Sequence, residues 1–179
     1  ALAKIAGIKL CENYYKQYSD NFISVMPNNL YGLNDNFHPD TSHVIPALIQ
    51  KFHNAKLGSS KYVEIWGTGN PLREFLHVDD LAEAILFIIN NVSVEEIYKK
   101  GISHINVGSG EELSIHELAL MIKEVVGFEG KIKFDKSKPD GTPRKLLDST
   151  FLNEKGWNPK IKLKKGIREL YNHYQKIDF

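Results

Sequence analysis

The side chain best suited to acid–base chemistry in this sequence is His43, which lies in a loop of histidines, prolines and short polar residues at 36–48. The loop runs directly into an apolar helical stretch, so the backbone at His43 is held while its ring can face a cleft. Histidine exchanges protons near neutral pH, which makes His43 a candidate general acid or base. The alternative is a loop histidine that bonds only to nearby backbone.

A second group of residues is suited to binding an anionic ligand. Arg73 and Lys145 lie in turn-rich stretches, where arginine can hold a phosphate through two parallel hydrogen bonds and lysine acts as a point charge. Trp66 offers a flat apolar surface for a base or a sugar ring. Each residue alone could be structural, with Trp66 in the core and the cations in solvent. Together they favour a nucleotide diphosphate as the ligand.

Other chemistries lack their usual motifs. The G-x-G pairs at 67–69 and 108–110 have no third glycine, so we interpret both as turns and expect the phosphate-binding loop of any nicotinamide cofactor to lie outside this sequence. His38, His43 and His53 do not have the spacing of a structural zinc site, and we expect no metal. A serine hydrolase has no G-x-S-x-G motif to support it.

The composition is that of an ordinary globular protein, with 42% hydrophobic and 25% charged residues among 179. The net charge of +1 argues against a nucleic acid or an anionic membrane surface as the partner. Cys11 is the single cysteine, which excludes an internal disulfide and suits a reducing compartment. No apolar run approaches the roughly 20 residues that span a bilayer. We therefore expect a soluble, cytoplasmic protein.

Hydrophobic periodicity predicts alternating helices and strands, the arrangement in which α/β proteins bind ligands at strand ends. A helix is expected over 1–18; it begins without an N-cap residue, so we expect the sequence to be the C-terminal portion of a longer chain. Helices are also expected over 44–53 and 163–174. The Pro-Asn-Asn-Leu-Tyr-Gly stretch at 27–32 is interpreted as a turn. Strands are expected at 22–26, 61–66, 104–107 and 131–134.

Two helix starts carry capping signals. Ser114 and Glu117 fit a capping box, in which each side chain bonds a free backbone N–H of the other residue, and Gly127 fits the end of that helix. Asp80 and Glu83 fit a second capping box, an interpretation that we prefer to a catalytic role for Asp80. The helix after Asp80 is expected to bury Leu81, Ala84, Ile85, Ile88 and Ile89.

Several stretches resemble the epimerase-reductases of the extended short-chain dehydrogenase/reductase family that act on GDP-4-keto-6-deoxymannose. The most specific part is Asn-Phe-His-Pro at 36–39 followed by Ser-His-Val-Ile-Pro-Ala-Leu at 42–48. Arg-Glu-Phe-Leu-His-Val-Asp-Asp at 73–80 also matches, but it occurs more widely among nucleotide-sugar enzymes. The resemblance covers nearly the whole chain, with further matches at 3–12, 27–32, 103–108 and 137–145.

The resemblance implies an α/β fold that combines the last elements of an NAD(P)-binding Rossmann domain with a small mixed α/β domain for the GDP-sugar. The Rossmann elements are expected at 1–35 and about 75–108, and the substrate domain at 36–74 and about 109–179. The glycine-rich loop, the catalytic tyrosine directly before Ala1 and the family's catalytic cysteine are expected to lie outside the sequence. We therefore expect this segment alone to be inactive.

The family's site residues can be carried over by resemblance. Lys4 resembles the lysine that binds the nicotinamide ribose and lowers the pKa of the catalytic tyrosine. His43 resembles the acid/base of the epimerisation, which also lies close to the cofactor, NADP(H). Lys51 stands where the family often has arginine, so a point charge is expected there rather than a two-pronged phosphate contact. Further cofactor contacts are expected from Pro27, Asn28, Asn29 and Leu30, and GDP-sugar contacts from Lys51, Trp66, Arg73, Asp140 and Lys145.

The expected partners are a GDP-sugar and, for the complete chain, a second copy in a homodimer that uses the helix carrying Lys4. Two alternatives stay open. One is another nucleotide-sugar epimerase or dehydratase of the same family, which would not need His43. The other is a non-catalytic GDP-sugar-binding module, which the mass of the native protein distinguishes from an enzyme, because the enzyme requires a far longer chain.

Overall fold

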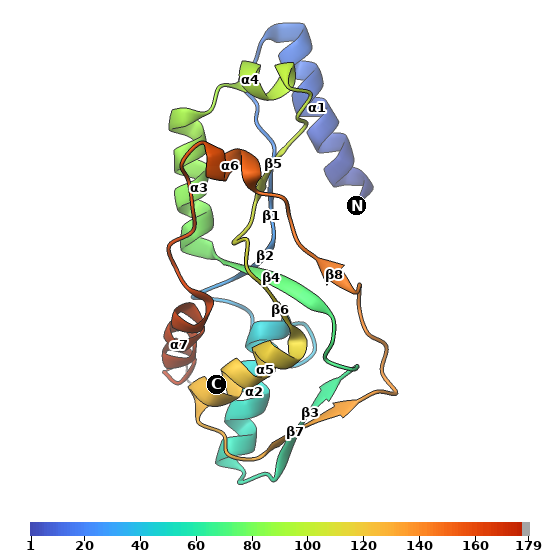
Figure 1. The fold of residues 1–179 in the computed structure, drawn as a ribbon, viewed down its shortest axis with the longest axis vertical. Helices are drawn as coiled ribbons and strands as arrows, with labels where there is room; N and C mark the ends of the chain where they lie inside the picture. The colour runs from blue at the N-terminus through green and yellow to red at the C-terminus, as the bar shows by residue number, and fades with distance from the viewer. Residues whose placement is uncertain (177–179) are drawn as a thin grey trace.

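The computed structural model describes residues 1–176 and shows an elongated α/β molecule (Figure 1). Within these residues, no helix combines the length and the apolar character needed to cross a membrane. In chain order the elements are α1 (Leu2–Tyr18), β1 (Val25–Pro27), β2 (Asn29–Tyr31), α2 (Val44–Leu57), β3 (Tyr62–Trp66), β4 (Leu72–His77), α3 (Val78–Asn91), α4 (Val94–Lys99), β5 (Ile105–Val107), β6 (Glu112–Ser114), α5 (Ile115–Val126), β7 (Lys131–Asp135), β8 (Arg144–Lys145), α6 (Thr150–Glu154) and α7 (Leu163–Tyr174).

Strand β4 lies at the middle of the molecule and has three strand neighbours. It pairs in parallel with β2 and β8 and antiparallel with β6. Two smaller parallel ribbons flank this sheet: β1 with β5, and β3 with β7. In Figure 1 the β1–β5 ribbon lies in the upper half and the β3–β7 ribbon in the lower half, with β4 between them. Any rearrangement of β4 would therefore disturb the packing in both halves of the molecule.

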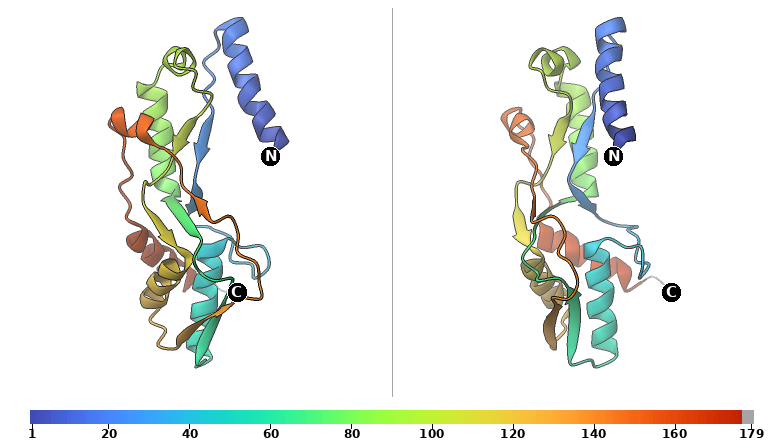
Figure 2. Two further views of the ribbon diagram at one scale, coloured as in Figure 1. Left: turned by 45° about the vertical axis from the view of Figure 1, so that its right-hand side comes forward. Right: turned by 90° about the vertical axis from the view of Figure 1, so that its right-hand side faces the viewer.

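Two clusters of buried apolar side chains form the cores of the two halves. In the lower cluster, α2, α5 and α7 pack with β3 through residues such as Ile49, Leu118 and Leu170. In the upper cluster, Leu76 and Ile105 pack with α3 and with the apolar residues of the α6 region. Figure 2 shows β1 and β5 running between α1 and α3. Burial on this scale, at roughly 25 cal/mol per Å² of apolar surface, is the main stabilising contribution for such a domain.

The predicted helix over 1–18 is confirmed as α1, and its position is fixed by an aromatic contact. The ring of Tyr15 stacks on Tyr98 of α4, with centroids 4.8 Å apart. Over the part of the chain that the structure describes, α1 buries no residue, and Ile5 and Tyr18 of its apolar stripe are exposed. Ile8, Cys11 and Tyr15 of the same stripe are half-buried, so the middle of the apolar stripe faces the rest of the molecule and only its ends are exposed.

The predictions for α5 and α7 are confirmed in detail. The Ser114 hydroxyl accepts a hydrogen bond from the Glu117 N–H at 3.1 Å, and the Glu117 carboxylate accepts one from the Ser114 N–H at 2.7 Å. Gly127 ends α5 with φ 72°, a left-handed conformation that glycine adopts without strain. The bounds of α7 coincide with the predicted 163–174.

The predicted strand at 22–26 and turn at 27–32 are wrong in their boundaries. The ladder begins at Val25 and continues past Asn28, so that much of the expected turn forms β2. Parallel pairing with β5 and β4 supplies the hydrogen bonds for this segment. These long-range partners outweigh the local turn preference of proline and asparagine.

The predicted capping box at Asp80 and Glu83 is also wrong. Helix α3 begins earlier, with His77 as its N-cap. His77 Nδ1 accepts a hydrogen bond from the Asp79 N–H at 3.2 Å. Asp80 is buried, and its carboxylate accepts hydrogen bonds from the backbone N–H groups of Lys160 and Ile161, both at 3.0 Å. Asp80 therefore fixes the segment that leads into α7 instead of capping its own helix.

The buried face of α3 is narrower than its apolar pattern suggests. Ala84 and Ile88 are buried as predicted, whereas Ile85 and Ile89 are exposed. The two exposed isoleucines line an apolar hollow next to Phe22. The short β1–β5 ribbon covers only one stripe of the helix, which explains the difference.

Candidate functional site

A cavity of about 670 Å³ lies between β2, the loop that follows it and the N-terminus of α2. This volume falls in the range of small-molecule sites in proteins. His43, Asn28, Asn29 and Leu30 line the cavity. The structure thus brings the predicted acid/base and three of the predicted cofactor contacts to one place.

The two asparagines are held by the strands around them. The Asn28 N–H donates to the Val107 carbonyl of β5 at 3.1 Å, which fixes the backbone between β1 and β2. Its side-chain amide donates to the buried carboxylate of Glu74, and its Oδ1 accepts a hydrogen bond from the Asn29 N–H at 2.7 Å. Asn29 Nδ2 donates to the Glu74 carbonyl at 2.8 Å. Both amides are therefore oriented by one residue of β4, Glu74.

His43 occupies the N-cap position of α2, with an extended backbone at φ −76° and ψ 171°. The helix behind it is anchored in the lower cluster by Ile45, Ile49 and Phe52, all buried. His43 itself is exposed. A fixed backbone with a free ring is the arrangement that the sequence predicted, and it allows the imidazole to exchange protons with a molecule in the cavity.

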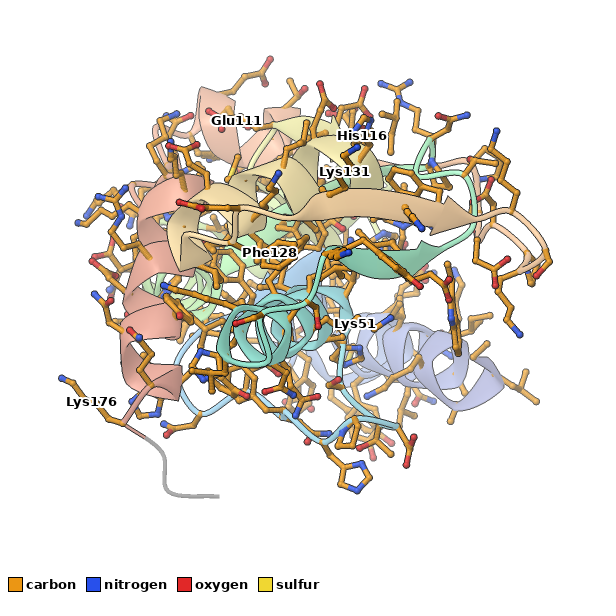
Figure 3. The ribbon with its side chains drawn as sticks, turned by 90° about the horizontal axis from the view of Figure 1, so that it is seen from below. Lys51, Glu111, His116, Phe128, Lys131 and Lys176 are labelled. Carbon is orange, nitrogen blue, oxygen red and sulfur yellow. The ribbon has the colours of Figure 1, made fainter. Side chains whose placement is uncertain are left out.

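Trp66, at the end of β3, is 66% exposed, so the alternative that places it in the core is wrong. Two lysines face its ring: Lys51 Nζ lies 5.6 Å from the ring centroid and Lys138 Nζ lies 5.5 Å from it. Lys51 projects from α2 in Figure 3 and donates to the Glu64 carbonyl at 3.2 Å. A solvent-exposed aromatic ring with two cations next to it suits the base and phosphates of a nucleotide.

Asp140 closes the 137–143 loop over the end of β3. Its carboxylate accepts hydrogen bonds from the Thr68 hydroxyl at 2.7 Å and from the Thr68 N–H at 2.8 Å. These two bonds, the hydroxyl first, lower the pKa of Asp140. Gly67 has φ 82°, and a Cβ there would collide with Asp140 Oδ1, so only glycine allows this closure. Both carboxylate oxygens are thus engaged with the turn next to Trp66.

Arg73 and Lys145 meet across two paired strands. They are register partners in the parallel β4–β8 pairing. Arg73 Nη1 donates to the Leu72 carbonyl at 2.7 Å and to the Thr142 carbonyl at 2.6 Å. Arg73 therefore fixes the loop that carries Asp140, and Lys145 is exposed beside it. All five predicted GDP-sugar residues lie on connected elements: α2, β3, β4, β8 and the loop before β8.

Trp66 and the basic residues near it form a surface that we call the cation-rich surface: Lys51, Arg73, Lys138 and Lys145. The cavity and this surface share two elements. Along α2, His43 lies at the N-terminus and Lys51 eight residues further on, about 12 Å at the helical rise. Along β4, Arg73 lies at the cation-rich surface and Phe75 lines the cavity. One ligand with an anionic part and a small ring could contact both regions.

Two predicted cofactor residues lie outside the set that lines the cavity. Pro27 ends β1 and pairs with Val107 of β5. Lys4 lies in the first turn of α1 and is exposed. In Figure 1 the N-terminal end of α1 lies to the right of β1 and β5 and points away from them. The roles of Pro27 and Lys4 remain predictions.

The sequence analysis missed two residues of this region. Glu74 follows Arg73 in the 73–80 motif, and a glutamate in a strand that continues with apolar residues is a signal for a buried, fully bonded carboxylate. Lys138 was quoted only within the basic 137–145 stretch, and its position over Trp66 depends on the fold of that loop. Only the first of the two could have been suspected from the pattern.

Comparison with known proteins gives consistent matches. The sequence model of the NAD dependent epimerase/dehydratase family matches residues 1–108. A probable GDP-L-fucose synthase 1 of Oryza sativa subsp. japonica is 57% identical over 174 residues, covering 97% of this chain and 51% of that protein. The GDP-L-fucose synthase of Escherichia coli (strain K12) is 51% identical over 178 residues, covering 97% of this chain and 55% of that protein.

A solved structure shows the same fold. The GDP-mannoheptose C4 reductase from Campylobacter jejuni, with NADP bound, superposes with a TM-score of 0.87 at 39% sequence identity. The match covers 98% of this chain and 59% of that one. The chain therefore spans about half the length of the curated relatives it matches. These matches confirm the predicted α/β fold and the predicted resemblance.

Proposed function

Because this chain belongs to the NAD-dependent epimerase/dehydratase family, we propose that the full-length protein converts GDP-4-keto-6-deoxymannose to GDP-L-fucose with NADPH. The names of the two relatives at 57% and 51% identity support this substrate and product. The observation that carries the proposal is the position of His43 in the cavity, on the same helix as Lys51 beside the exposed Trp66. The reaction would be an epimerisation at C3 and C5, followed by reduction at C4.

The cation-rich surface would hold the nucleotide. Lys51, Arg73 and Lys145 would provide positive charge for the diphosphate, and Trp66 would stack with the base. Asp140 would keep the loop closed beside Trp66, because both of its oxygens bond to Thr68. This division leaves the sugar directed along α2 and β4 toward the cavity.

The cavity would hold the sugar ring and the nicotinamide. When bound, NADPH supplies the hydride for C4. The residues present fit its nicotinamide end, because Asn28, Asn29 and Leu30 lie on the cavity wall and the two amides are held there by their bonds to Glu74 and to each other. Lys4 would bind the ribose, as the resemblance implies.

His43 would move the protons of the epimerisation. The 4-keto group acidifies C3 and C5, so a base can remove a proton from either carbon and an acid can donate another proton on the opposite face. An exposed imidazole at a fixed helix N-cap is suited to this exchange, because only its ring has to move. We assign His43 the acid/base role on one face of the ring.

We further propose the domain division expected from the sequence, with Rossmann elements at 1–35 and about 75–108 and the substrate domain at 36–74 and about 109–179. The two apolar clusters support the division in outline. The exceptions are Leu152 and Trp157, which pack in the cluster of the first unit, and Tyr31 and Phe75, which pack in the cluster of the second. We also propose that the full-length protein is a homodimer in the cytoplasm, since its single cysteine here suits a reducing compartment. Light scattering on the purified protein tests the dimer.

The test uses the full-length protein with GDP-4-keto-6-deoxymannose and NADPH in deuterated water. Consumption of NADPH with deuterium at C3 and C5 of the product supports both activities. Reduction without label indicates a 4-reductase, the activity named for the C. jejuni structure. If neither change occurs, the substrate is a different nucleotide sugar and the proposal fails.

The role of His43 is tested in the same assay with His43→Gln. We expect the variant to lose deuterium incorporation. His38→Gln is the matched control, because His38 is exposed in the same loop but is not among the residues lining the cavity. Equal labelling by wild type and His43→Gln would contradict the assignment.

A further inference from the structure

A buried carboxylate in β4 connects the segments that surround the cavity. Glu74 is completely buried at the middle of β4. We infer that Glu74 is a positioning residue that orients Asn28 and Asn29 for the cofactor, an inference that rests on the proposed function. Glu74 itself is not among the residues that line the cavity.

The carboxylate of Glu74 receives hydrogen bonds from segments far apart in the sequence. Its Oε2 accepts from the side-chain amide of Asn28 and from the Leu147 N–H at 3.1 Å. Its Oε1 accepts from the Gly110 N–H at 2.7 Å and from the Ser109 hydroxyl at 3.5 Å. One side chain therefore ties the β1–β2 junction to the turn after β5 and to the chain after β8.

All of these donors are neutral, so the negative charge of Glu74 is stabilised by oriented N–H and O–H groups rather than by a cation. The neighbouring Arg73 directs its guanidinium to the Leu72 and Thr142 carbonyls. A buried carboxylate needs such donors, and removing the charge leaves the donors facing a weaker acceptor. A neutral amide in its place would also point an N–H₂ group at one of these donors.

The space around Glu74 shows the same requirement. A Cβ on Gly108 would collide with Glu74 Oε1, so the backbone at 108 can approach the carboxylate this closely only because the residue is glycine. The loop at 108–110 is thus shaped around Glu74. The G-x-G pair at this loop, interpreted from sequence as a plain turn, has this packing role in addition.

The orientation of both asparagines depends on Glu74. Because Asn28 Nδ2 donates to the carboxylate, its Oδ1 is turned to accept hydrogen bonds from the Asn29 N–H at 2.7 Å and from Asn29 Nδ2 at 3.0 Å. Asn29 Nδ2 also donates to the Glu74 carbonyl. If the carboxylate is lost, the Asn28 amide is free to rotate, and the orientation of both asparagine amides on the cavity wall changes.

The experiment compares NADPH binding with GDP binding in the full-length protein by titration calorimetry. For Glu74→Gln we expect the Kd for NADPH to rise about tenfold, the loss expected for one hydrogen bond to a charged group, with the Kd for GDP unchanged. Glu74→Asp, which keeps the charge, should recover part of the affinity. An unchanged Kd for NADPH overturns the inference, as does a parallel loss of both affinities together with the melting temperature.

Glu112→Gln is the matched control. Glu112 is the register partner of Glu74 in β6, but its carboxylate pairs with Arg144 at 2.8 Å rather than with Asn28. We expect this variant to bind both ligands as wild type does. If Glu112→Gln weakens NADPH binding as much as Glu74→Gln does, the loss of affinity comes from a general disturbance of the sheet and not from Glu74. The inference then fails.

Gly108→Ala provides a second perturbation if Glu74→Gln does not fold. The added methyl group displaces the carboxylate without removing it, so the same selective loss of NADPH affinity is expected. Because binding is measured without the sugar, failure of the proposed reaction is distinguishable. A wild-type protein that binds NADPH but leaves the sugar unchanged overturns only the proposed function, whereas one that binds no NADPH overturns both.

Discussion

Replacement of Trp66 by alanine tests whether the cation-rich surface binds the nucleotide. The ring is 66% exposed and has Lys51 and Lys138 at 5.6 Å and 5.5 Å from its centroid. A base that stacks on Trp66 would take the place of a lysine on the ring face and keep both cations close to the phosphates. Trp66→Ala removes the stacking surface without touching the core.

The size of the effect follows from two opposing contributions. Stacking of a base on an aromatic side chain contributes about 1–3 kcal/mol. A base must first displace a lysine from the ring face, and a cation–ring contact at an exposed site contributes about 0.5–1 kcal/mol. With the middle of each range, the net loss for Trp66→Ala is about 1.2 kcal/mol, which corresponds to an increase of roughly eightfold in the Kd for GDP.

The assay is titration of full-length wild type and variant with GDP by calorimetry. Tyr62→Ala is the control, because Tyr62 lies on the same outward face of β3, is half exposed and has Lys133 Nζ 3.7 Å from its ring. This control should leave GDP affinity unchanged. An unaltered Kd in Trp66→Ala, or an equal loss in Tyr62→Ala, would refute the assignment of the base to Trp66.

Three further predictions concern stability and pH. Asp80→Asn should lower the free energy of unfolding by about 2 kcal/mol, because one of the two buried hydrogen bonds to backbone N–H groups is lost. Asp79→Asn is the control and should change the free energy of unfolding little, because Asp79 is exposed. Urea titration measures both variants. The pKa of Asp140 is lowered, so its closure of the loop should persist above its ordinary pKa of 3.8 and disappear as pH falls through the lowered value. Trp66 fluorescence should report this transition, and Asp140→Asn should abolish it. Tyr31→Phe should raise the free energy of unfolding by about 1 kcal/mol, since the buried Tyr31 hydroxyl has no hydrogen-bond partner among the described residues. A lower free energy of unfolding, measured by urea titration, would contradict this prediction.

Local signals in the sequence predicted the elements whose partners are close in the chain. The capping box of Ser114 and Glu117, with Gly127 at the helix end, located α5 because all three act within a single helix. The 3.6-residue pattern located α7 for the same reason. The loop with His43 was also visible, because a polar, proline-rich stretch before an apolar helix is a local pattern.

The parts that sequence analysis missed depend on distant partners. Asp80 has the spacing of a cap, but its acceptors are used by backbone N–H groups some eighty residues away, which no local pattern reveals. The short strands β2 and β8 exist because β4 pairs with them. Trp66 was as compatible with a core position as with a surface, and only the pairing of β3 with β7 decides which side it faces.

The long-range pairings have a consequence for how the molecule folds. Strand β3 pairs with β7, and β4 with β8, across about seventy residues of intervening chain in each case, and contacts of such high sequence separation form slowly because the loop must close first. Helices α2 and α5 can form from their own residues well before this. During synthesis, Trp66 and Arg73 therefore emerge long before the 137–145 segment that completes their surroundings. The surface proposed to bind the nucleotide is complete only after residues 137–145 have emerged. A nascent chain released before residue 145 would therefore be unable to hold its ligand, and it would also lack the α6 and α7 side chains that complete both apolar clusters.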